Sequence, residues 1–409
     1  MGRDRDTGTV KIFKRADILI PVKEIDLNKW SIIACDQFTS NPEYWDEVEK
    51  IVGDSPSTLR LILPEAYLGR RDKDELKADI GKKMEEYLNA GYFNKCSNCL
   101  IYIERKLSNG KVRKGLIGMI DLEHYSYLPD VSARIVSSEG TILSRLPERA
   151  DIRRNASLEL PHIILFIDDR EDIIINNSSD SEELYFVSLM QGGGELKAFK
   201  LSDSHAEEIE ELVANLSDRS PLAVGDGNHS LAAAKLIWEE AKENLAVEEA
   251  QISPLRYALV ELQNIYDSAV DIEAIHRVLL NCDAYKTIDE IEKELSDESP
   301  DGLNIELIYK NGKKQLKTRY ANVSELIENL DELLKKICDI GKGEIDFIHG
   351  EKETEDIGRN DNNLGILLPS IKKEDIFSCI KTQGPYPRKS FSVGEARDKR
   401  YYLEAREIV

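Results

Sequence analysis

The six residues Gly225 to Ser230, Gly-Asp-Gly-Asn-His-Ser, bring together groups that could bind an anionic ligand and act on it. An apolar run over 221–224 precedes them and an alanine-rich stretch follows, an order that predicts a strand, a tight turn and the start of a helix. Glycines permit the sharp bend and the close approach of a ligand, and the first amides of a helix attract negative charge. The pattern therefore predicts a phosphate-binding turn.

Each residue of this turn has an expected role. Asp226 is a candidate base or magnesium ligand, and His229 is a candidate phosphate contact or acid–base group. The remaining residues are candidates for holding the phosphate: Gly225, Gly227, Asn228 and Ser230. The alternative is a helix without a ligand, capped by Asp226 or Asn228, in which His229 is a structural histidine.

The turn lacks the common signatures of nucleotide-binding and hydrolase loops. The P-loop pattern G-x-x-x-x-G-K-[ST] is absent, and G-x-G-x-x-G fails because Ser230 stands where the third glycine belongs. The serine-hydrolase pattern G-x-S-x-G is also missing. Standard P-loop, dinucleotide-binding and serine-hydrolase interpretations are therefore disfavoured.

An arginine-rich segment from residue 134 to residue 154 is a second candidate site. On a helix begun at Pro147, Arg149 and Arg153 are four apart and share one face. Guanidinium groups match the paired oxygens of carboxylates and phosphates, so the segment predicts an anion site. The alternative is a solvent-exposed face whose arginines pair with nearby acidic side chains. The candidate ligand-binding residues are Arg134, Glu139, Thr141, Arg145 and Arg149.

His276, Arg277 and Asp36 are candidates with weaker local patterns. We expect a helix over 271–280, on which His276 could titrate or, with Arg277, hold a phosphate; the alternative is packing at a helix surface. Asp36 ends an expected strand over 31–36 and is a candidate metal ligand or base, or else a turn or N-cap residue.

The segment Gly384 to Phe391 holds the last group of candidates. Its two prolines stiffen the chain, and Arg388, Lys389 and Ser390 follow with two cations and a hydroxyl. Such a segment could close over a phosphoryl group, and the alternative is a basic surface loop.

The elements that must position these groups alternate between hairpins and helices. Hairpins are expected across 108–110, 192–194 and 311–312, where glycine and asparagine favour turns. A strict strand–helix alternation is absent, so we predict an α+β fold of mixed sheets with hairpins and flanking helices. The expected division is an N-terminal α+β domain over 1–220 and a C-terminal α+β domain over 221–409 that carries the turn, with a semi-independent lobe at about 283–340.

The composition indicates a globular protein with an acidic surface. The chain has 409 residues, of which 41% are apolar and 32% charged, with a net charge of −22. This charge repels nucleic acid and acidic membranes, so neither is an expected partner. No apolar run approaches the roughly 20 residues of a membrane span, and the first residues lack a signal peptide, so a cytoplasmic location is expected.

Six cysteines fit a reducing compartment and free thiols. Only Cys96 and Cys99 form a C-x-x-C pair. A structural zinc site requires a second pair or suitably spaced histidines, and none follows nearby. A redox pair, a zinc site and ordinary loop or core cysteines stay open, and no metal-ligand set is predicted.

Several short motifs together resemble one protein family. On them the chain is identified as a member of the domain of unknown function 1015 family, over nearly its whole length. The resemblance implies no established activity. The motifs are Ala34 to Trp45, Glu139-Gly140-Thr141, Leu160-Pro161-His162, Gly225 to Ser230, Ile275-His276-Arg277, and Pro387 to Phe391.

A remoter resemblance concerns the turn alone. The run Asp226 to His229 before a helix is similar to the Gly-x-His-Arg turn of the ParB/sulfiredoxin-like fold, which includes sulfiredoxins, nucleotide-hydrolysing ParB clamps and free-serine kinases. In those proteins the turn and the helix N-terminus cradle nucleotide phosphates, which implies the same ligand class here. Ser230 departs from the family pattern, because it stands where the usual arginine would be. Arg145, Arg149 or Arg388 could supply the missing cation.

The leading hypothesis is an enzyme that acts on a phosphorylated small molecule or a nucleotide, by positioning and charge stabilisation as in phosphoryl transfer. Arg145 and Lys389 are its expected charge stabilisers, and magnesium is expected only if phosphoryl transfer is the reaction. One alternative is a non-catalytic sensor of an anion or nucleotide. A ParB-like DNA-binding protein conflicts with the net charge. A metal-dependent hydrolase is also open, with the ligands Asp36, Asp226, His229 and His276.

Overall fold

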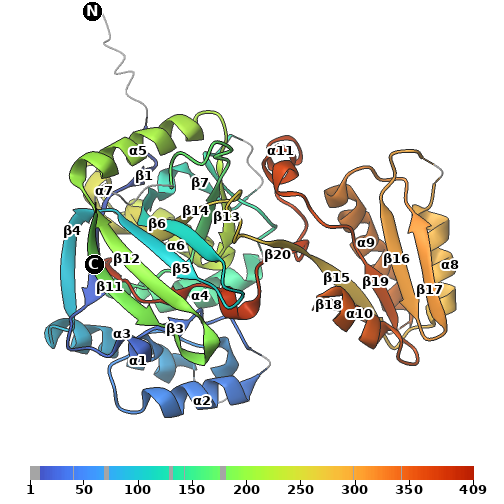
Figure 1. Cartoon of the computed structure of the whole chain (residues 1–409), viewed down its shortest axis with the longest axis horizontal. Coiled ribbons are helices and arrows are strands. Elements are labelled where there is room, and N and C mark those ends of the chain that lie inside the picture. The colour runs from blue at the N-terminus through green and yellow to red at the C-terminus, as the bar shows by residue number, and fades with distance from the viewer. Residues whose placement is uncertain are drawn as a thin grey trace, which may run out of the picture. The chain divides into compact units, whose positions relative to one another are not determined.

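The chain forms two compact units (Figure 1). The computed structural model describes residues 10–39, 41–68, 73–128, 132–141, 143–175, 181–297, 299–341 and 343–409. Unit 1 comprises Met1–Ser137, Thr141–Val270 and Glu395–Val409, and unit 2 comprises Ser138–Gly140 and Asp271–Gly394. The chain thus leaves unit 1 after residue 270 and returns to it at residue 395.

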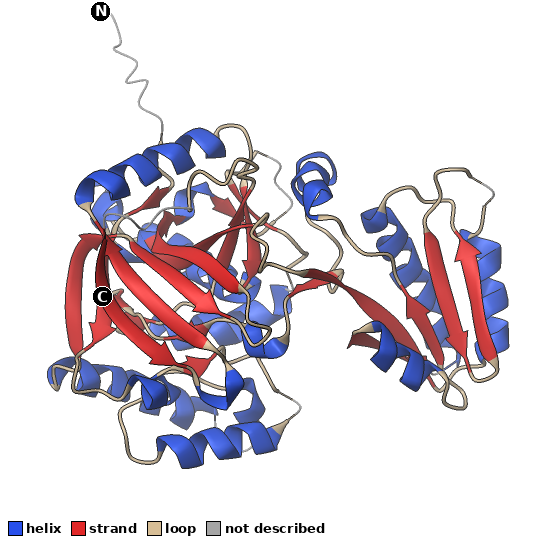
Figure 2. Ribbon diagram, in the orientation of Figure 1, coloured by secondary structure: helices blue, strands red, loops and turns tan. Residues whose placement is uncertain are grey.

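A ten-stranded mixed sheet forms the centre of unit 1 (Figure 2). Its strands in spatial order are β11 (Ser181–Ser188), β12 (Glu195–Leu201), β5 (Ile101–Lys106), β6 (Val112–Asp121), β14 (Tyr257–Asn264), β10 (Ile164–Ile167), β13 (Leu222–Asp226), β8 (Ile135–Ser137) and β7 (Tyr125–Ser126), and β1 (Phe13–Lys14) pairs with β6. The pairs β10–β14, β13–β8 and β7–β8 are parallel, whereas the other pairs are antiparallel.

This sheet is buried on both faces, which explains why its central strands are almost continuously apolar. In β5, Ile101 and Ile103 belong to one hydrophobic cluster, while Tyr102 between them belongs to another. Side chains alternate between faces along a strand, so the two clusters lie on opposite sides of the sheet.

Helices and three small strand pairs complete unit 1. The α-helices are α1 (Leu27–Trp30), α2 (Pro42–Val52), α3 (Lys73–Asn89), α4 (Leu146–Arg154), α5 (Asp203–Ser217), α6 (Asn228–Lys242) and α7 (Val247–Ile252). The strand pairs are β2 (Ala16–Pro21) with β4 (Phe93–Cys99), β3 (Ile32–Ile33) with β21 (Tyr401–Tyr402), and β9 (Leu158–Glu159) with β22 (Arg406–Glu407). Short 3₁₀ helices cover Thr58–Arg60, Glu65–Tyr67, Leu122–His124, Leu143–Arg145, Met190–Gly192, Pro254–Arg256 and Ala396–Asp398.

The last segment, Glu395–Val409, is an integral part of unit 1. Arg400 Nε lies 2.8 Å from a Glu261 carboxylate oxygen, and Arg406 Nε lies 2.6 Å from Glu159 Oε1, with all four side chains buried. Because removing one partner of a buried ion pair leaves an uncompensated charge, these contacts tie the segment firmly to the sheet.

Unit 2 has its own six-stranded sheet and its own hydrophobic core. Its strands in spatial order are β17 (Gly312–Lys317), β16 (Asn304–Tyr309), β19 (Leu364–Leu367), β15 (Ile272–Leu280) and β18 (Glu344–His349), and β20 (Phe391–Val393) also pairs with β15. Its helices are α8 (Ala284–Leu295), α9 (Val323–Gly341), α10 (Glu351–Gly358) and α11 (Lys373–Gln383). The lobe expected at about 283–340 lies within this unit.

The α+β prediction is confirmed, as are the hairpins across 108–110, 192–194 and 311–312. The helix expected over 271–280 is wrong, because these residues form β15, which has strand partners on both sides. Apolar residues on both faces of a central strand imitate helical spacing. The boundary expected after residue 220 falls inside unit 1, where β13 pairs with β10 and β8. Among the described residues, no helix combines the length and apolarity that a membrane span requires.

Candidate functional site

The turn between β13 and α6 has the conformation expected from its glycines. Gly227 is the N-cap of α6 with φ of 78°, a left-handed value that favours glycine. A Cβ at Gly227 would lie 3.0 Å from Ile163 Cα, and one at Gly225 would lie 2.2 Å from the Phe166 ring. Both glycines are therefore needed for close packing against the segment around β10, whether or not the turn binds a ligand.

Asp226 lies at the end of β13 and has partners within unit 1. Its Oδ1 accepts a hydrogen bond from Gly227 N at 2.9 Å, and its Oδ2 lies 3.3 Å from Lys399 Nζ. Lys399 belongs to the last segment of the chain. The charge of Asp226 is thus balanced by Lys399, which is far from the turn in the sequence.

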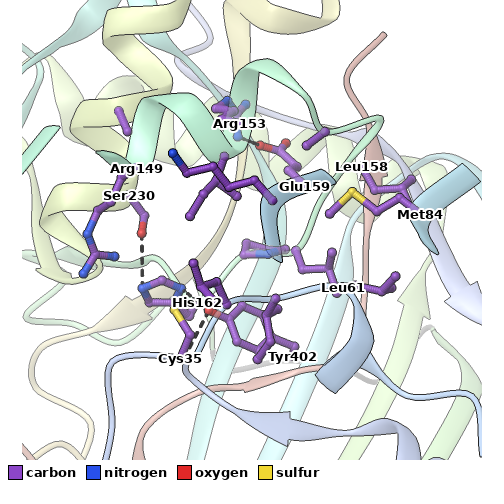
Figure 3. Close-up of a pocket in the computed structure, with 18 of the residues that line it drawn as sticks. Cys35, Leu61, Met84, Arg149, Arg153, Leu158, Glu159, His162, Ser230 and Tyr402 are labelled. Atoms are coloured by element: carbon purple, nitrogen blue, oxygen red, sulfur yellow. Dashed lines mark hydrogen bonds and ion pairs between the residues drawn. The ribbon is translucent and has the colours of Figure 1, made fainter. Parts of the chain in front are cut away.

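A cavity of about 420 Å³ lies beside the start of α6 (Figure 3). This volume is within the usual range of ligand pockets, roughly 300–1,000 Å³. Figure 3 shows Arg149, Ser230, His162, Cys35 and Tyr402 on one side of it, and Leu61, Leu158 and Met84 on the other. The polar lining residues are Cys35, Glu65, Lys77, Arg149, Arg153, Glu159, His162, Ser230 and Tyr402. A cavity with apolar walls and one polar side suits a small organic molecule with a charged group.

His162 is the centre of the polar side. The residue is 4% exposed, its Nε2 lies 3.3 Å from Ser230 Oγ and 4.0 Å from Asp36 Oδ2, and its Nδ1 lies 2.7 Å from the Tyr402 hydroxyl. Ser230, in the first turn of α6, therefore connects the predicted phosphate-binding turn to the cavity.

The two ring nitrogens of His162 have different neighbours. Burial, followed by Cys35 and Asp36, raises the pKa of Tyr402 well above its ordinary value, so the tyrosine keeps its proton. The Tyr402 oxygen accepts from Cys35 N at 3.4 Å, and the same hydroxyl lies against His162 Nδ1. The other ring nitrogen, Nε2, faces both Ser230 and Asp36. A Ser-His-Asp triad needs the carboxylate at Nδ1, so this arrangement is not one.

The neighbouring residues Cys35 and Asp36 differ in ionisation, so Cys35 is a poor nucleophile and Asp36 is a usable base. Burial and then Asp36 raise the pKa of the Cys35 thiol to about 12, so it stays protonated. Burial also opposes ionisation of Asp36, but the charges of His162 and Arg149 outweigh it and lower the pKa of Asp36 below its usual value. Asp36 is therefore ionised at neutral pH, and its Oδ1 accepts from Gln37 Nε2 at 3.0 Å.

Two arginines from one face of α4 line the cavity. Arg149 pairs with Glu65, and Arg153 Nη1 lies 2.7 Å from Glu159 Oε2. Nε and Nη2 of Arg153 are buried and have no hydrogen-bond partner among the described residues. Glu159 also holds Arg406, so one carboxylate supports both α4 and the last segment.

Of the described candidates of unit 1, Arg149 and Ser230 line the cavity, whereas Asp36, Asp226 and the others lie outside its lining. Arg134 Nη2 pairs with Asp218 Oδ1 at 2.7 Å, and Thr141 Oγ1 lies 3.4 Å from Ser137 Oγ. Asn228 and His229 are the first two residues of α6. The side chain of Arg145 lies outside the described part of the chain.

The candidates of unit 2 have structural partners there. The Glu139 carboxylate accepts hydrogen bonds from the backbone amides of Lys389, Ser390 and Phe391 at 3.3, 3.0 and 3.1 Å. Burial raises the pKa of Glu139, although these amides oppose the shift. The loop that we expected to close over a phosphoryl group thus holds a carboxylate of the same unit, and the guanidinium of Arg388 lies over the Phe347 ring, 5.6 Å from its centroid.

His276 and Arg277 are buried in β15. Arg277 is fully buried, and its Nε and Nη2 donate to the two oxygens of Asp331 at 2.8 and 2.9 Å. His276 Nδ1 accepts from Leu368 N at 3.1 Å, and burial, then Arg277 and His349, lower the pKa of His276 to about 4. Among the residues that the structure describes, no group of three or more His, Cys, Asp or Glu side chains could hold a metal ion.

Reasoning from the sequence missed His162, Lys399 and Tyr402, among others, as site residues. His162 stands in an apolar run without an adjacent glycine or acidic residue, and it is 240 positions from Tyr402. The one available signal was the motif Leu160-Pro161-His162, which entered only through the family resemblance.

A family model described as "Protein of unknown function (DUF1015)" matches residues 19–334. The chain belongs to the DUF1015 family. This confirms the resemblance that the short motifs indicated, and the matched residues include the cavity except for its contribution from Tyr402. No curated protein matches the chain.

Several solved structures are distantly similar to this DUF1015 protein. They include C-terminally truncated SbnI from Staphylococcus aureus (9% identity, TM-score 0.36, covering 68% of this chain and 82% of that chain) and a conserved hypothetical protein from Pyrococcus furiosus (10%, 0.38, 72% and 95%). A free serine kinase in complex with AMP is also similar (10%, 0.40, 72% and 92%). At these identities and scores the likeness carries no inference about ligand or reaction.

Proposed function

We propose that the cavity of unit 1 binds a phosphorylated small molecule or a nucleotide. The observation that carries this proposal is the pair of arginines from α4, which line a cavity of about 420 Å³ together with Ser230 from the first turn of α6. Arginine and a helix N-terminus are two independent attractors of phosphate. The apolar walls provide a surface for the uncharged part of the ligand.

The free donors of Arg153 support an anionic ligand. A buried donor without an acceptor costs about 1–3 kcal/mol, and a ligand oxygen would remove that cost. Arg149 is paired with Glu65 in the absence of ligand, so a phosphate would compete with a carboxylate for its guanidinium. Both arginines are thus held in place before the ligand binds, which lowers the entropic cost of binding.

We propose phosphoryl transfer as the reaction. In this step the bond between the donor's bridging oxygen and phosphorus breaks, an acceptor oxygen bonds to phosphorus, and the acceptor's hydroxyl proton passes to Asp36. Asp36 suits this role because it is ionised and its Oδ2 lies 4.0 Å from Nε2 of His162, which lines the cavity. Mg²⁺ is commonly held by one or two carboxylates and by substrate phosphates, and if the reaction requires it, Asp36 and Asp226 are the carboxylates that would hold it.

Binding is tested by thermal shift and calorimetry with AMP, ADP, ATP and pyrophosphate, with and without Mg²⁺. We expect one of them to stabilise the protein, and Arg149→Gln and Arg153→Gln each to weaken its binding at least about tenfold, the loss of a charge-assisted hydrogen bond. Arg134→Gln is the matched control, since Arg134 lies outside the cavity lining. If no phosphate compound binds, or if all three variants bind equally well, the proposal fails.

Catalysis is tested separately with Asp36→Asn and Asp226→Asn. If the protein is a phosphotransferase, Asp36→Asn should retain ligand binding and lose at least about a hundredfold in turnover, since general base catalysis contributes roughly 10²–10⁴-fold. The production of phosphorylated acceptor, followed by phosphorus NMR, is the readout. Binding without turnover in the wild-type protein would instead support a non-catalytic sensor.

A further inference from the structure

The strand pair β2–β4 is irregular at the one C-x-x-C sequence of the chain. Ala16 pairs with Cys99 and Ile18 pairs with Cys96, so Asp17 alone faces two residues of β4, Ser97 and Asn98. This is a β-bulge, and Asn98 has φ of 44°. In a regular strand, residues three apart point to opposite faces, but one extra residue returns them to the same face. The bulge therefore brings Cys96 and Cys99 together.

Asp17 holds the bulge in this conformation. Its Oδ1 accepts a hydrogen bond from Asn98 N at 2.8 Å, and its Oδ2 lies 2.7 Å from Lys95 Nζ. The backbone amide that the bulge removes from the strand ladder is thus satisfied by the residue opposite. This arrangement fixes the cysteine pair independently of the thiols themselves.

The two thiols differ in exposure and acidity. Cys99 is 1% exposed and its Sγ donates to Cys96 O at 3.3 Å, whereas Cys96 is half-buried. The interaction with the Cys99 side chain lowers the pKa of Cys96 to about 7, despite some burial. The same interaction between the two side chains, followed by burial, raises the pKa of Cys99. An accessible thiolate beside a buried thiol is the usual arrangement of an attacking and a resolving cysteine.

We propose that Cys96 and Cys99 form a reversible thiol–disulfide site that exchanges with low-molecular-weight disulfides of the glutathione type. Cys96 thiolate attacks one sulfur of the disulfide, forms a mixed disulfide and releases one thiolate. Cys99 then loses its proton and attacks Cys96 Sγ, which closes the Cys96–Cys99 bond and releases the second thiolate. Two electrons pass from the protein to the small disulfide, and the two protons are taken up by the released thiolates.

The site is tested on the full-length reduced protein with oxidised and reduced glutathione at fixed ratios. After acid quenching, free thiols are alkylated and located by mass spectrometry. We expect the wild-type protein to lose two of its six thiols, with no glutathione retained. Cys99→Ser should accumulate one glutathione on residue 96, and Cys96→Ser should retain all its thiols. Cys379→Ser, in unit 2, is the matched control and should behave as wild type.

Two further measurements address the geometry and the acidity. Alkylation of Cys96 by iodoacetamide should have its midpoint near pH 7, about 1.5 units below that of an ordinary cysteine. Asp17→Ala releases the Asn98 amide and should slow disulfide closure. It also removes a charge that raises the pKa of Cys99, which alone would favour closure, so slower closure reports on the bulge. Wild-type protein that keeps all six thiols, or Cys96→Ser that loses thiols as fast as Cys379→Ser, would overturn the proposal. If the disulfide closes at the wild-type rate in Asp17→Ala, the claim that the bulge positions the two cysteines is wrong.

Discussion

The polar side chains of the candidate site are held by neighbours distant in the sequence. His162 is positioned by Tyr402 and by Ser230, while Asp36 is kept ionised by His162 and Arg149. Local sequence patterns identified three candidates: Asp36 at the end of an expected strand, Ser230 at the start of an expected helix, and Arg149 in an arginine-rich segment. They could not identify His162, since its partners Asp36, Ser230 and Tyr402 come from three separate segments.

His276 should make the stability of unit 2 dependent on pH. Its pKa in the folded state is about 4, against an ordinary value of 6.5, so between these values the unfolded chain binds a proton that the folded chain does not. Stability should therefore fall as the pH falls from about 6.5 to about 4, by about 2 kcal/mol at pH 5.

Hydrogen exchange of the β15 amides at pH 7 and pH 5 measures this loss, after correction for intrinsic rates. His276→Asn should abolish most of the pH dependence, because an amide oxygen can accept the Leu368 N–H bond and does not titrate in this range. Equal losses of protection in the wild-type protein and the variant would show that another group is responsible.

At the scale of elements, the turn before α6 illustrates what local signals can predict. Its strand–turn–helix order, its left-handed glycine and its exposed start of a helix all follow from residue types within ten positions. The hairpins across 108–110 and 311–312 were predicted for the same reason. The helix predicted over 271–280 was wrong because the strand conformation of β15 is decided by three partner strands, none of which adjoins it in sequence.

Gly227→Ala should destabilise unit 1 more than Gly91→Ala does. Gly227 and Gly91 both have positive φ, but a Cβ at Gly91 meets nothing within 4 Å, whereas one at Gly227 meets Ile163. We expect Gly91→Ala to cost about 1 kcal/mol of unfolding free energy and Gly227→Ala about 2–4 kcal/mol, since overpacking adds to the backbone strain.

Tryptophan fluorescence during denaturant unfolding can compare these variants, because Trp30, Trp45 and Trp238 all lie in unit 1. If the two alanine variants lose the same unfolding free energy, the segment around Ile163 moves aside without cost. The close packing of the turn would then contribute nothing to stability.

At the scale of the whole molecule, unit 2 interrupts unit 1 in sequence. Gly394 N donates to Asp271 O at 2.9 Å, so the two ends of the interruption lie side by side. The expected boundary after residue 220 missed this arrangement, because no glycine-rich or proline-rich linker marks either residue 270 or residue 395. Discontinuous units of this kind leave little local signal in a sequence.

Replacing 271–394 by a short Gly-Ser linker should leave unit 1 folded, with a cooperative tryptophan unfolding transition. A chain that ends at residue 270 should lose that transition, because Glu159 and Glu261 would be buried without Arg406 and Arg400. Failure of the linker variant to unfold cooperatively would show that unit 1 requires unit 2.

The return of the chain at residue 395 has a consequence for biosynthesis. Lys399 and Tyr402 belong to the candidate site, yet more than a hundred residues of unit 2 are translated between them and the rest of unit 1. At roughly 5–20 residues per second, the ribosome needs about 6–25 s for that stretch. Throughout this interval Glu159 lacks Arg406 and Glu261 lacks Arg400, so the nascent unit 1 cannot complete these buried ion pairs until the last segment emerges.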